Sequence, residues 1–209
     1  MEKLLSLLVG LTGGMGTGKT LAASIFKELG AHILDADLIC RKLVEPGQPA
    51  LKEISEYFGD NIFDKTRSLD RKKLAQVIFN DPDKKKILEN ILHPKVFEFE
   101  KNEYKNICNI NPRALVIIDA ALLIESGNYK NMDKVVVIST DENKQIERIL
   151  ARGGLHKDEI VSRINNQMPS HEKKRYADFI LDNSADKFQL RNQVEGLYAK
   201  LNVLAKNFH

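Results

Sequence analysis

Five short apolar runs alternate along the chain with longer segments of helical periodicity. Because the runs lack polar alternation, they are typical of strands buried on both faces, as in parallel sheets. They occupy residues 4–11, 32–34, 115–119, 135–138 and 179–181. Helical spacing of apolar residues predicts helices over residues 19–29, 146–152 and 186–204. This alternation predicts an α/β fold: a three-layer sandwich with a five-stranded parallel sheet and right-handed crossovers.

Residues 38–111 differ from the rest of the chain, because helical periodicity continues there without a strand. Leu74, Val77 and Ile78 repeat at helical spacing, and residues 87–92 do the same. Pro94 interrupts the second run, and it is predicted to bend or break that helix because proline lacks a backbone N–H. We interpret this segment as a helical insertion.

The strongest chemical signal is a glycine-rich segment directly after the first run. Residues 13–20 read GGMGTGKT and fit the phosphate-loop pattern G-x-x-x-x-G-K-[ST] in full. Such a loop turns its N–H groups toward phosphate oxygens, and the following helix adds the positive end of its dipole. Lys19 is predicted to reach the β- and γ-phosphates of ATP, and the Thr20 hydroxyl to hold Mg²⁺. The predicted nucleotide contacts here are Gly14, Met15, Gly16, Thr17, Gly18, Lys19, Thr20 and Leu21.

Carboxylates end two of the predicted strands. Asp35 and Asp37 follow the second run, at the sheet edge that lines ligand crevices in open α/β folds. In an extended chain they point to opposite sides, so one of them is expected to meet the acceptor. The alternative is that both cap the following helix. Asp119 ends the third run in the pattern of a Walker B carboxylate, although a turn-forming Asp has the same pattern.

A basic segment follows the fourth run. Arg148 and Arg152 lie four residues apart on one predicted helix face, where planar guanidinium groups could bind phosphate oxygens. Residues 153–175 begin with two glycines and are charged, which predicts a hinged lid. Single lysines in this lid, Lys173 among them, are interpreted as part of a solvated helix face. The predicted division is therefore a core of 1–37, 112–152 and 176–209, the insertion 38–111 and the lid 153–175.

Composition limits the other possibilities. The 209 residues carry a formal net charge of +3, too balanced for a nucleic-acid footprint. Cys40 and Cys108 are far apart, which argues against a disulfide framework and favours a reducing cytoplasm. No run reaches the roughly 20 apolar residues of a membrane helix. The apolar face of residues 186–204 fits either a core or an interface, so a monomer or weak homo-oligomer is expected.

Taken together, the motifs resemble those of the dephospho-coenzyme A kinases over nearly the whole chain. The phosphate loop with its leading Leu-Thr, the Asp-Ala-Asp-x-x-x-Arg pattern and a His-Pro pair occur in the family's order. The matching positions are residues 11–20, 35–41, 46–50, 58–59, 69–71, 93–94, 122–125, Gln167, 177–178 and Asn183. Ala121 stands where the family usually has Pro, Leu21 where it often has Thr, and Gly153-Gly154 is a looser lid start.

The resemblance implies a reaction and assigns residues to it. ATP would phosphorylate the ribose 3′-hydroxyl of dephospho-coenzyme A, which the helical insertion would bind. Asp37 is similar to the family's catalytic base, and Arg148 to its lid arginine, so the expected catalytic residues are Asp37, Lys19 and Arg148. On the substrate side the expected residues are Asp35, Arg41 and His93, and Arg152 and Asn183 are expected on the nucleotide.

Two other functions stay open from the residues alone. A kinase of the same fold that acts on a nucleoside or nucleotide would need a smaller insertion than residues 38–111. A nucleotide-binding switch that regulates a partner would carry a guanine motif Asn-Lys-x-Asp if it used GTP. The nearest string, residues 142–145, lacks that Asp. We therefore rank the switch below the kinases.

Overall fold

The computed structural model describes residues 6–79 and 81–206. The chain forms two compact units, one made of Met1–Asp35 and Glu103–His209 and the other of Ala36–Asn102. Helix α5 (Pro82–Ile110) contains the second boundary between them. Within the described ranges, no helix combines the length and the apolar character needed to cross a bilayer.

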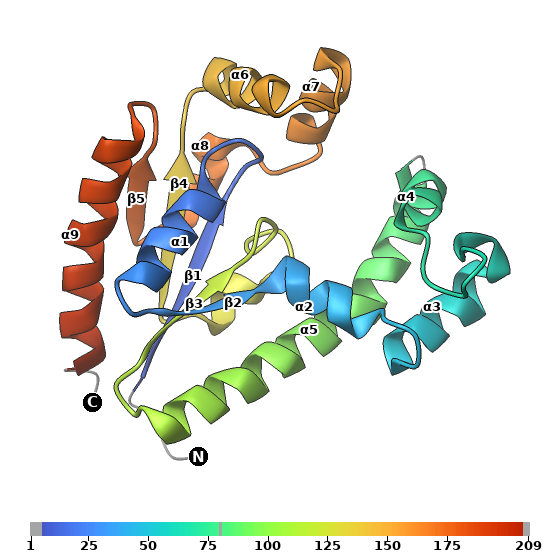
Figure 1. Cartoon of the computed structure of the whole chain (residues 1–209), viewed down its shortest axis with the longest axis horizontal. Helices are drawn as coiled ribbons and strands as arrows, with labels where there is room; N and C mark the ends of the chain where they lie inside the picture. Colours follow the sequence, from blue (N-terminus) through green and yellow to red (C-terminus); the bar gives the residue numbers. More distant parts are fainter. Residues whose placement is uncertain (1–5, 80, 207–209) are drawn as a thin grey trace. The chain divides into compact units, whose positions relative to one another are not determined.

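The larger unit is built around a five-stranded parallel sheet, as predicted (Figure 1). Its strands are β1 (Leu7–Gly13), β2 (His32–Asp35), β3 (Leu115–Asp119), β4 (Lys134–Ser139) and β5 (Phe179–Asp182), in the order β2-β3-β1-β4-β5. Residues 4 and 5 of the first predicted run lie outside the described residues. The central strand β1 pairs with β3 and β4, so the loop that follows it leaves the middle of the sheet.

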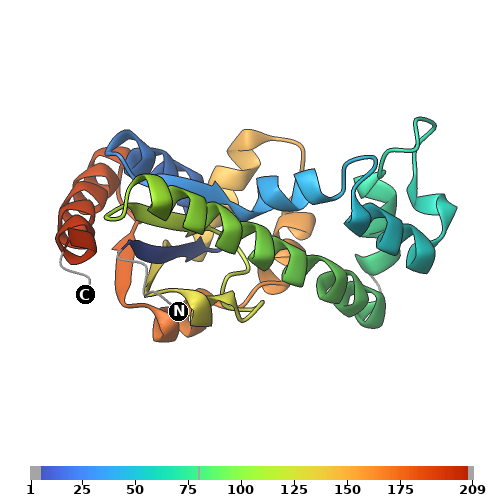
Figure 2. The ribbon, with the colours of Figure 1, turned by 90° about the horizontal axis from the view of Figure 1, so that it is seen from below.

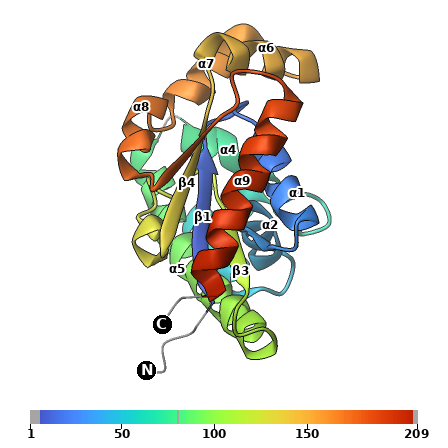
Figure 3. The ribbon, with the colours of Figure 1, turned by 90° about the vertical axis from the view of Figure 1, so that its left-hand side faces the viewer.

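Helices cover the sheet because its apolar strands need burial on both faces. Helix α1 (Lys19–Glu28) and helix α9 (Lys187–Lys206) contact each other and the strands on one face. Figures 2 and 3 show α8 (Ser170–Lys173) on the opposite side of the sheet. The remaining elements of this unit are η2 (Asn128–Asn131), α6 (Glu142–Arg152), α7 (Lys157–Asn165) and η3 (Lys174–Tyr176).

The apolar face of α9 closes the main core. Leu190, Val194, Leu197 and Leu201 are all buried and belong to the same hydrophobic cluster as Phe26 of α1. Of the two uses left open for this face, the structure therefore assigns it to the core.

The smaller unit is helical, as expected for the insertion. It contains α2 (Ala36–Leu43), α3 (Pro49–Phe58), η1 (Asp60–Ile62), α4 (Arg71–Phe79) and the first part of α5. Of the two outcomes predicted for Pro94, a bend or a break, the break does not occur, because α5 continues through this residue. Proline removes one backbone donor, but Leu88 and Leu92 before it pack against the unit's own core and hold the helix in place.

Candidate active site

Close packing makes glycine necessary at two positions of the phosphate loop. Gly16 and Gly18 have φ values of 81° and 97°, in the left-handed region that favours glycine. A Cβ on Gly18 would lie 2.2 Å from Asn183 Nδ2, and one on Gly16 would lie 2.9 Å from the carbonyl oxygen of Gln145. The loop is closed by Thr17, whose N–H and hydroxyl donate to Gly14 O at 3.2 and 2.8 Å.

The loop places Lys19 next to the carboxylate at the end of β3. Lys19 begins α1, and its Nζ donates to Asp119 Oδ1 in a largely buried ion pair. Asp35 is the register partner of Asp119 in the parallel pair β2–β3, so both carboxylates end their strands at the same sheet edge. Lys19, Asp119 and Asp35 therefore lie at the carboxyl edge of the sheet.

The spacing argument for Asp35 and Asp37 is wrong. Strand β2 ends at Asp35 and α2 begins at Ala36, so the chain is not extended between the two carboxylates. Asp37 instead lies in the first turn of α2, where the helix dipole favours a negative charge.

Three of the predicted site residues belong to the helical unit. Asp37 and Arg41 are exposed on α2. His93 is half-buried on α5, and its ring stacks on Phe97 with 5.8 Å between centroids. Burial lowers the pKa of His93, and the nearby Glu89 carboxylate partly opposes this. The ring is therefore suited to act as a neutral hydrogen-bonding group rather than as a fixed cation.

A hydrogen-bonded chain joins three residues that were predicted from separate parts of the sequence. Arg148 Nη2 donates to Asn183 O at 2.9 Å, and Asn183 Nδ2 donates to Thr17 O at 2.7 Å. Asn183 is buried, and Arg152 lies exposed in the last turn of α6. The structure thus brings Arg148 and Asn183 to the phosphate loop, while Arg152 lies one turn further along.

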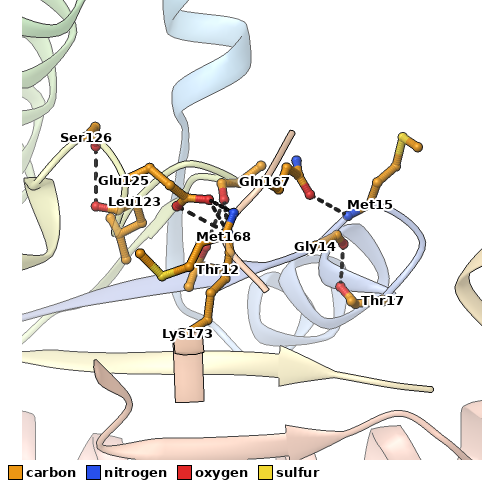
Figure 4. A network of polar contacts seen from close by, with 11 residues as sticks. Thr12, Gly14, Met15, Thr17, Leu123, Glu125, Ser126, Gln167, Met168 and Lys173 are labelled. Atoms are coloured by element: carbon orange, nitrogen blue, oxygen red, sulfur yellow. Dashed lines mark hydrogen bonds and ion pairs between the residues drawn. The ribbon is translucent and has the colours of Figure 1, made fainter. Parts of the chain in front are cut away.

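The residues between α7 and α8 form a polar network with the phosphate loop (Figure 4). Gln167 Oε1 accepts the Met15 N–H at 3.0 Å. Lys173 was predicted to be solvated, but its side chain is 1% exposed and pairs with Glu125. The prediction failed because a short helix in a charged segment was taken for a surface helix, whereas α8 packs beneath the loop that follows β3.

Two glutamines near the loop were not singled out by sequence reasoning. Gln145 is buried on α6 and donates to Thr140 O at 3.3 Å, and Gln167 was noted only as a signature match. Both line a pocket of about 490 Å³ that also includes Gly14 and Lys174. The available signal was the position of Gln145, four residues before Ile149 on the buried face of an amphipathic helix.

Fold and loop together define a class. A parallel sheet whose central strand runs into GGMGTGKT and then into a helix, with a lysine beside a strand-end carboxylate, is a P-loop kinase-like arrangement. A family model described as dephospho-CoA kinase matches residues 7–189. The chain therefore belongs to the dephospho-CoA kinase family, and it is an ATP-dependent kinase.

Individual relatives agree with the family match. The dephospho-CoA kinase of Syntrophotalea carbinolica is 38% identical, over 93% of this chain and 92% of that protein. The one from Aquifex aeolicus is also 38% identical, over 92% and 96%. The solved structure of the Campylobacter jejuni dephospho-CoA kinase superimposes with a TM-score of 0.71 at 28% identity, covering 95% of this chain and 98% of that one.

Proposed function

We propose that this chain transfers the γ-phosphoryl group of ATP to the ribose 3′-hydroxyl of dephospho-coenzyme A, giving coenzyme A and ADP. The single observation that carries the proposal is the loop geometry, in which Lys19 stands at the carboxyl edge of the sheet beside Asp119. Family membership over residues 7–189 supports the acceptor. The lysine ammonium would exchange its carboxylate partner for the β- and γ-phosphates when nucleotide binds.

The residues present fit a bound Mg²⁺. Thr20 is exposed in the first turn of α1, and Asp35 and Asp119 end adjacent strands at the same edge. In the described part of the chain, no group of three or more His, Cys, Asp and Glu side chains could hold a metal by itself. We infer that Thr20 and water-bridged carboxylates would hold the ion together with phosphate oxygens, as is usual for Mg²⁺. When bound, it would neutralise charge on the phosphates.

The acceptor side is assigned to the end of β2 and to residues of α2 and α5. Asp37 would accept the proton of the 3′-hydroxyl as that oxygen attacks the γ-phosphorus. Asp35, Arg41 and His93 would bind dephospho-coenzyme A, with Arg41 offering an exposed guanidinium to its phosphates.

The nucleotide side is assigned to α6 and the segment after β5. Arg148 would stabilise charge on the migrating phosphoryl group, and Arg152 would contact the nucleotide phosphates. Asn183 would lie against the adenine, since its side chain is already fixed on Thr17 of the loop. The division into core, insertion and lid, a cytoplasmic monomer or weak homo-oligomer, and the absence of nucleic-acid and membrane partners belong to the same proposal.

A coupled assay tests the reaction. Purified protein is incubated with Mg-ATP and dephospho-coenzyme A, and ADP and coenzyme A are followed together. We expect equal amounts of both products from the wild type. Lys19→Ala should lower the rate by about a hundredfold to a thousandfold, because it removes a cation from the developing charge. Asp37→Asn should lower kcat by about a hundredfold or more with little change in KM for ATP.

A matched variant controls for the loss of a lysine. Lys27→Ala removes an exposed cation from the last turn of the same helix, and its activity should equal that of the wild type. ADP formation with a different acceptor would keep the kinase and remove the substrate assignment. Tight nucleotide binding without turnover on any acceptor would overturn the proposed reaction.

A further inference from the structure

A glutamine outside the loop holds one of the loop's own N–H groups. Gln167 follows α7, and its Oε1 accepts the Met15 N–H at 3.0 Å. The same oxygen lies 3.6 Å from where a Cβ on Gly14 would stand, so the side chain rests along the loop backbone. Since the loop works by the direction of its N–H groups, whatever fixes Met15 also fixes the shape of the cradle.

The residue that follows Gln167 is held by an ion pair whose lysine, Lys173, is buried. Its neighbour Met168 donates its N–H to Glu125 Oε1 at 3.0 Å. Glu125 also pairs with Lys173 at 3.0 Å, and Lys173 donates to Ala121 O at 2.7 Å. Burying an ammonium group is unfavourable unless it is paired and hydrogen-bonded, and both conditions are met here. One carboxylate therefore anchors Met168, just before α8, and Lys173, at the end of α8.

The network closes on the strand that carries the loop. Ala121 O accepts a second hydrogen bond from Thr12 Oγ1 of β1, at 3.1 Å. A path of direct contacts thus runs from Thr12 through Ala121, Lys173 and Glu125 to the backbone of Met168. Gln167, the residue before Met168, accepts the Met15 N–H, and Met15 lies three residues after Thr12 (Figure 4). Apart from the covalent step between Met168 and Gln167, each contact of the path joins segments that are distant in sequence, so the loop is braced from outside.

We propose that Gln167 is a positioning residue of the phosphate cradle, kept in place by the Glu125–Lys173 pair. The inference rests on the proposed function, because it assumes that the loop binds the phosphates of ATP. A neutral acceptor suits this place. A carboxylate would accept the Met15 N–H equally well, but it would stand beside an anionic ligand. The only carboxylate of the path, Glu125, is neutralised by Lys173.

Substitutions at Gln167 separate a positioning role from simple structural support. The dissociation constant of a non-hydrolysable ATP analogue is measured by calorimetry, and kcat and both KM values by the coupled assay. Gln167→Ala should weaken analogue binding about tenfold, the size of a lost hydrogen bond, and raise KM for ATP more than KM for dephospho-coenzyme A. Gln167→Glu keeps size and acceptor, yet it should bind on the order of a hundredfold more weakly, with part of the loss recovered at high salt.

A structural brace alone predicts the opposite order, with Gln167→Glu nearer the wild type than Gln167→Ala. That order, or analogue binding within twofold of wild type for Gln167→Ala, would overturn the proposal. Gln189→Glu makes the same charge change on an exposed face of α9 and should bind normally. The binding measurement needs no turnover. A wild type that binds the analogue but makes no coenzyme A would therefore remove the proposed reaction and leave this test intact.

A double-mutant cycle tests the role of the ion pair. Glu125→Ala removes the acceptor of Met168 and the partner of Lys173, so it should weaken analogue binding as Gln167→Ala does. Both substitutions act along one path. The double variant should therefore bind the analogue with an affinity within about twofold of that of the single variant that binds it less tightly. Glu125→Gln keeps an acceptor for Met168 but removes the charge paired with Lys173, so its affinity should lie between those of the wild type and Glu125→Ala. Additive effects of the two alanine substitutions would show that the pair does not act through Gln167.

Discussion

Single residues connect the phosphate loop to parts of the chain that are far away in sequence. Asn183 occupies the space next to Gly18 and donates to Thr17, 166 residues away. The lysine of the loop pairs with Asp119, and Arg148 is linked to the loop through Asn183, which bonds Thr17. The motif GGMGTGKT identifies the loop, but these contacts determine its geometry.

Replacing Gly18 tests this dependence. In Gly18→Ala the new methyl group would lie 2.2 Å from Asn183 Nδ2, at a φ of 97°. We expect a lower melting temperature and nucleotide binding weakened tenfold or more, because Asn183 must move. Gly127→Ala is the matched control, with φ 78° and no atom within 4 Å of the new Cβ. It should show only the backbone cost of about 1–2 kcal/mol and normal binding. Equal binding losses in both variants would contradict the role of Asn183.

The pKa of His93 should appear in the pH dependence of stability. Burial lowers this pKa in the folded protein, so the unfolded chain binds more protons as the pH falls below the ordinary value of 6.5. The free energy of unfolding should therefore decrease on acidification below pH 6.5, and this contribution should level off below the folded pKa. Urea unfolding at pH 7.5 and 5.5 measures the decrease, which should be smaller in His93→Gln. The same substitution at the exposed His171 serves as the control, and a pH dependence unchanged in His93→Gln would contradict the assignment.

At the scale of elements, helix α9 has a clear inner and outer face. Leu201 is fully buried in the main core, whereas Leu204, one turn further on, is 37% exposed. Leu201→Ala should lower the free energy of unfolding by about 2–5 kcal/mol, the usual cost of a cavity of this kind. Leu204→Ala should change it by less than about 1 kcal/mol. Denaturant titrations measure both values, and similar losses would mean that α9 is not seated as described.

The sequence was informative about elements wherever a pattern was long or had one explanation. The five strands and the helices α1 and α9 were predicted because apolar runs and 3.6-residue periods reflect burial directly. At Pro94 a break was one of two predicted outcomes, and it does not occur. The packing of Leu88 and Leu92, a tertiary property that the sequence does not show, outweighs one missing backbone hydrogen bond. Asp37 misled because an extended chain was assumed to continue for two residues beyond Asp35, whereas α2 begins at Ala36.

Residues of the candidate site could be predicted only where they belong to a recognised sequence motif or end a predicted strand. Lys19, Asp119 and the glycines follow from the loop pattern and the strand ends. Gln145, Lys173 and the pairing of Gln167 with Met15 depend on segments that meet only after folding. A lysine in a charged segment has no sequence mark that distinguishes a buried, paired ammonium group from one on a solvated helix face, so Lys173 was assigned to the wrong class.

At the scale of the whole molecule, the two units should respond to different ligands. Hydrogen exchange measured with the ATP analogue should show protection around residues 13–20 and 183, since the nucleotide contacts are assigned to the larger unit. Addition of dephospho-coenzyme A should extend protection into residues 36–102, where Arg41 and His93 lie. At a hundredfold excess over its dissociation constant, the analogue should stabilise the protein by about 2.7 kcal/mol. Protection of 36–102 by the analogue alone would contradict this division.

The order of strands in the sheet has a consequence for folding during synthesis on the ribosome. The central strand β1 is made first, but its partners β3 and β4 come more than a hundred residues later, and Asn183 later still. At roughly 5–20 residues per second, about 8–33 seconds separate the synthesis of Thr17 from that of Asn183. The phosphate-binding segment therefore leaves the ribosome long before the parts that shape it. A nascent chain that ends before β4 should not be retained on immobilised ATP, whereas a chain extended through α9 should be.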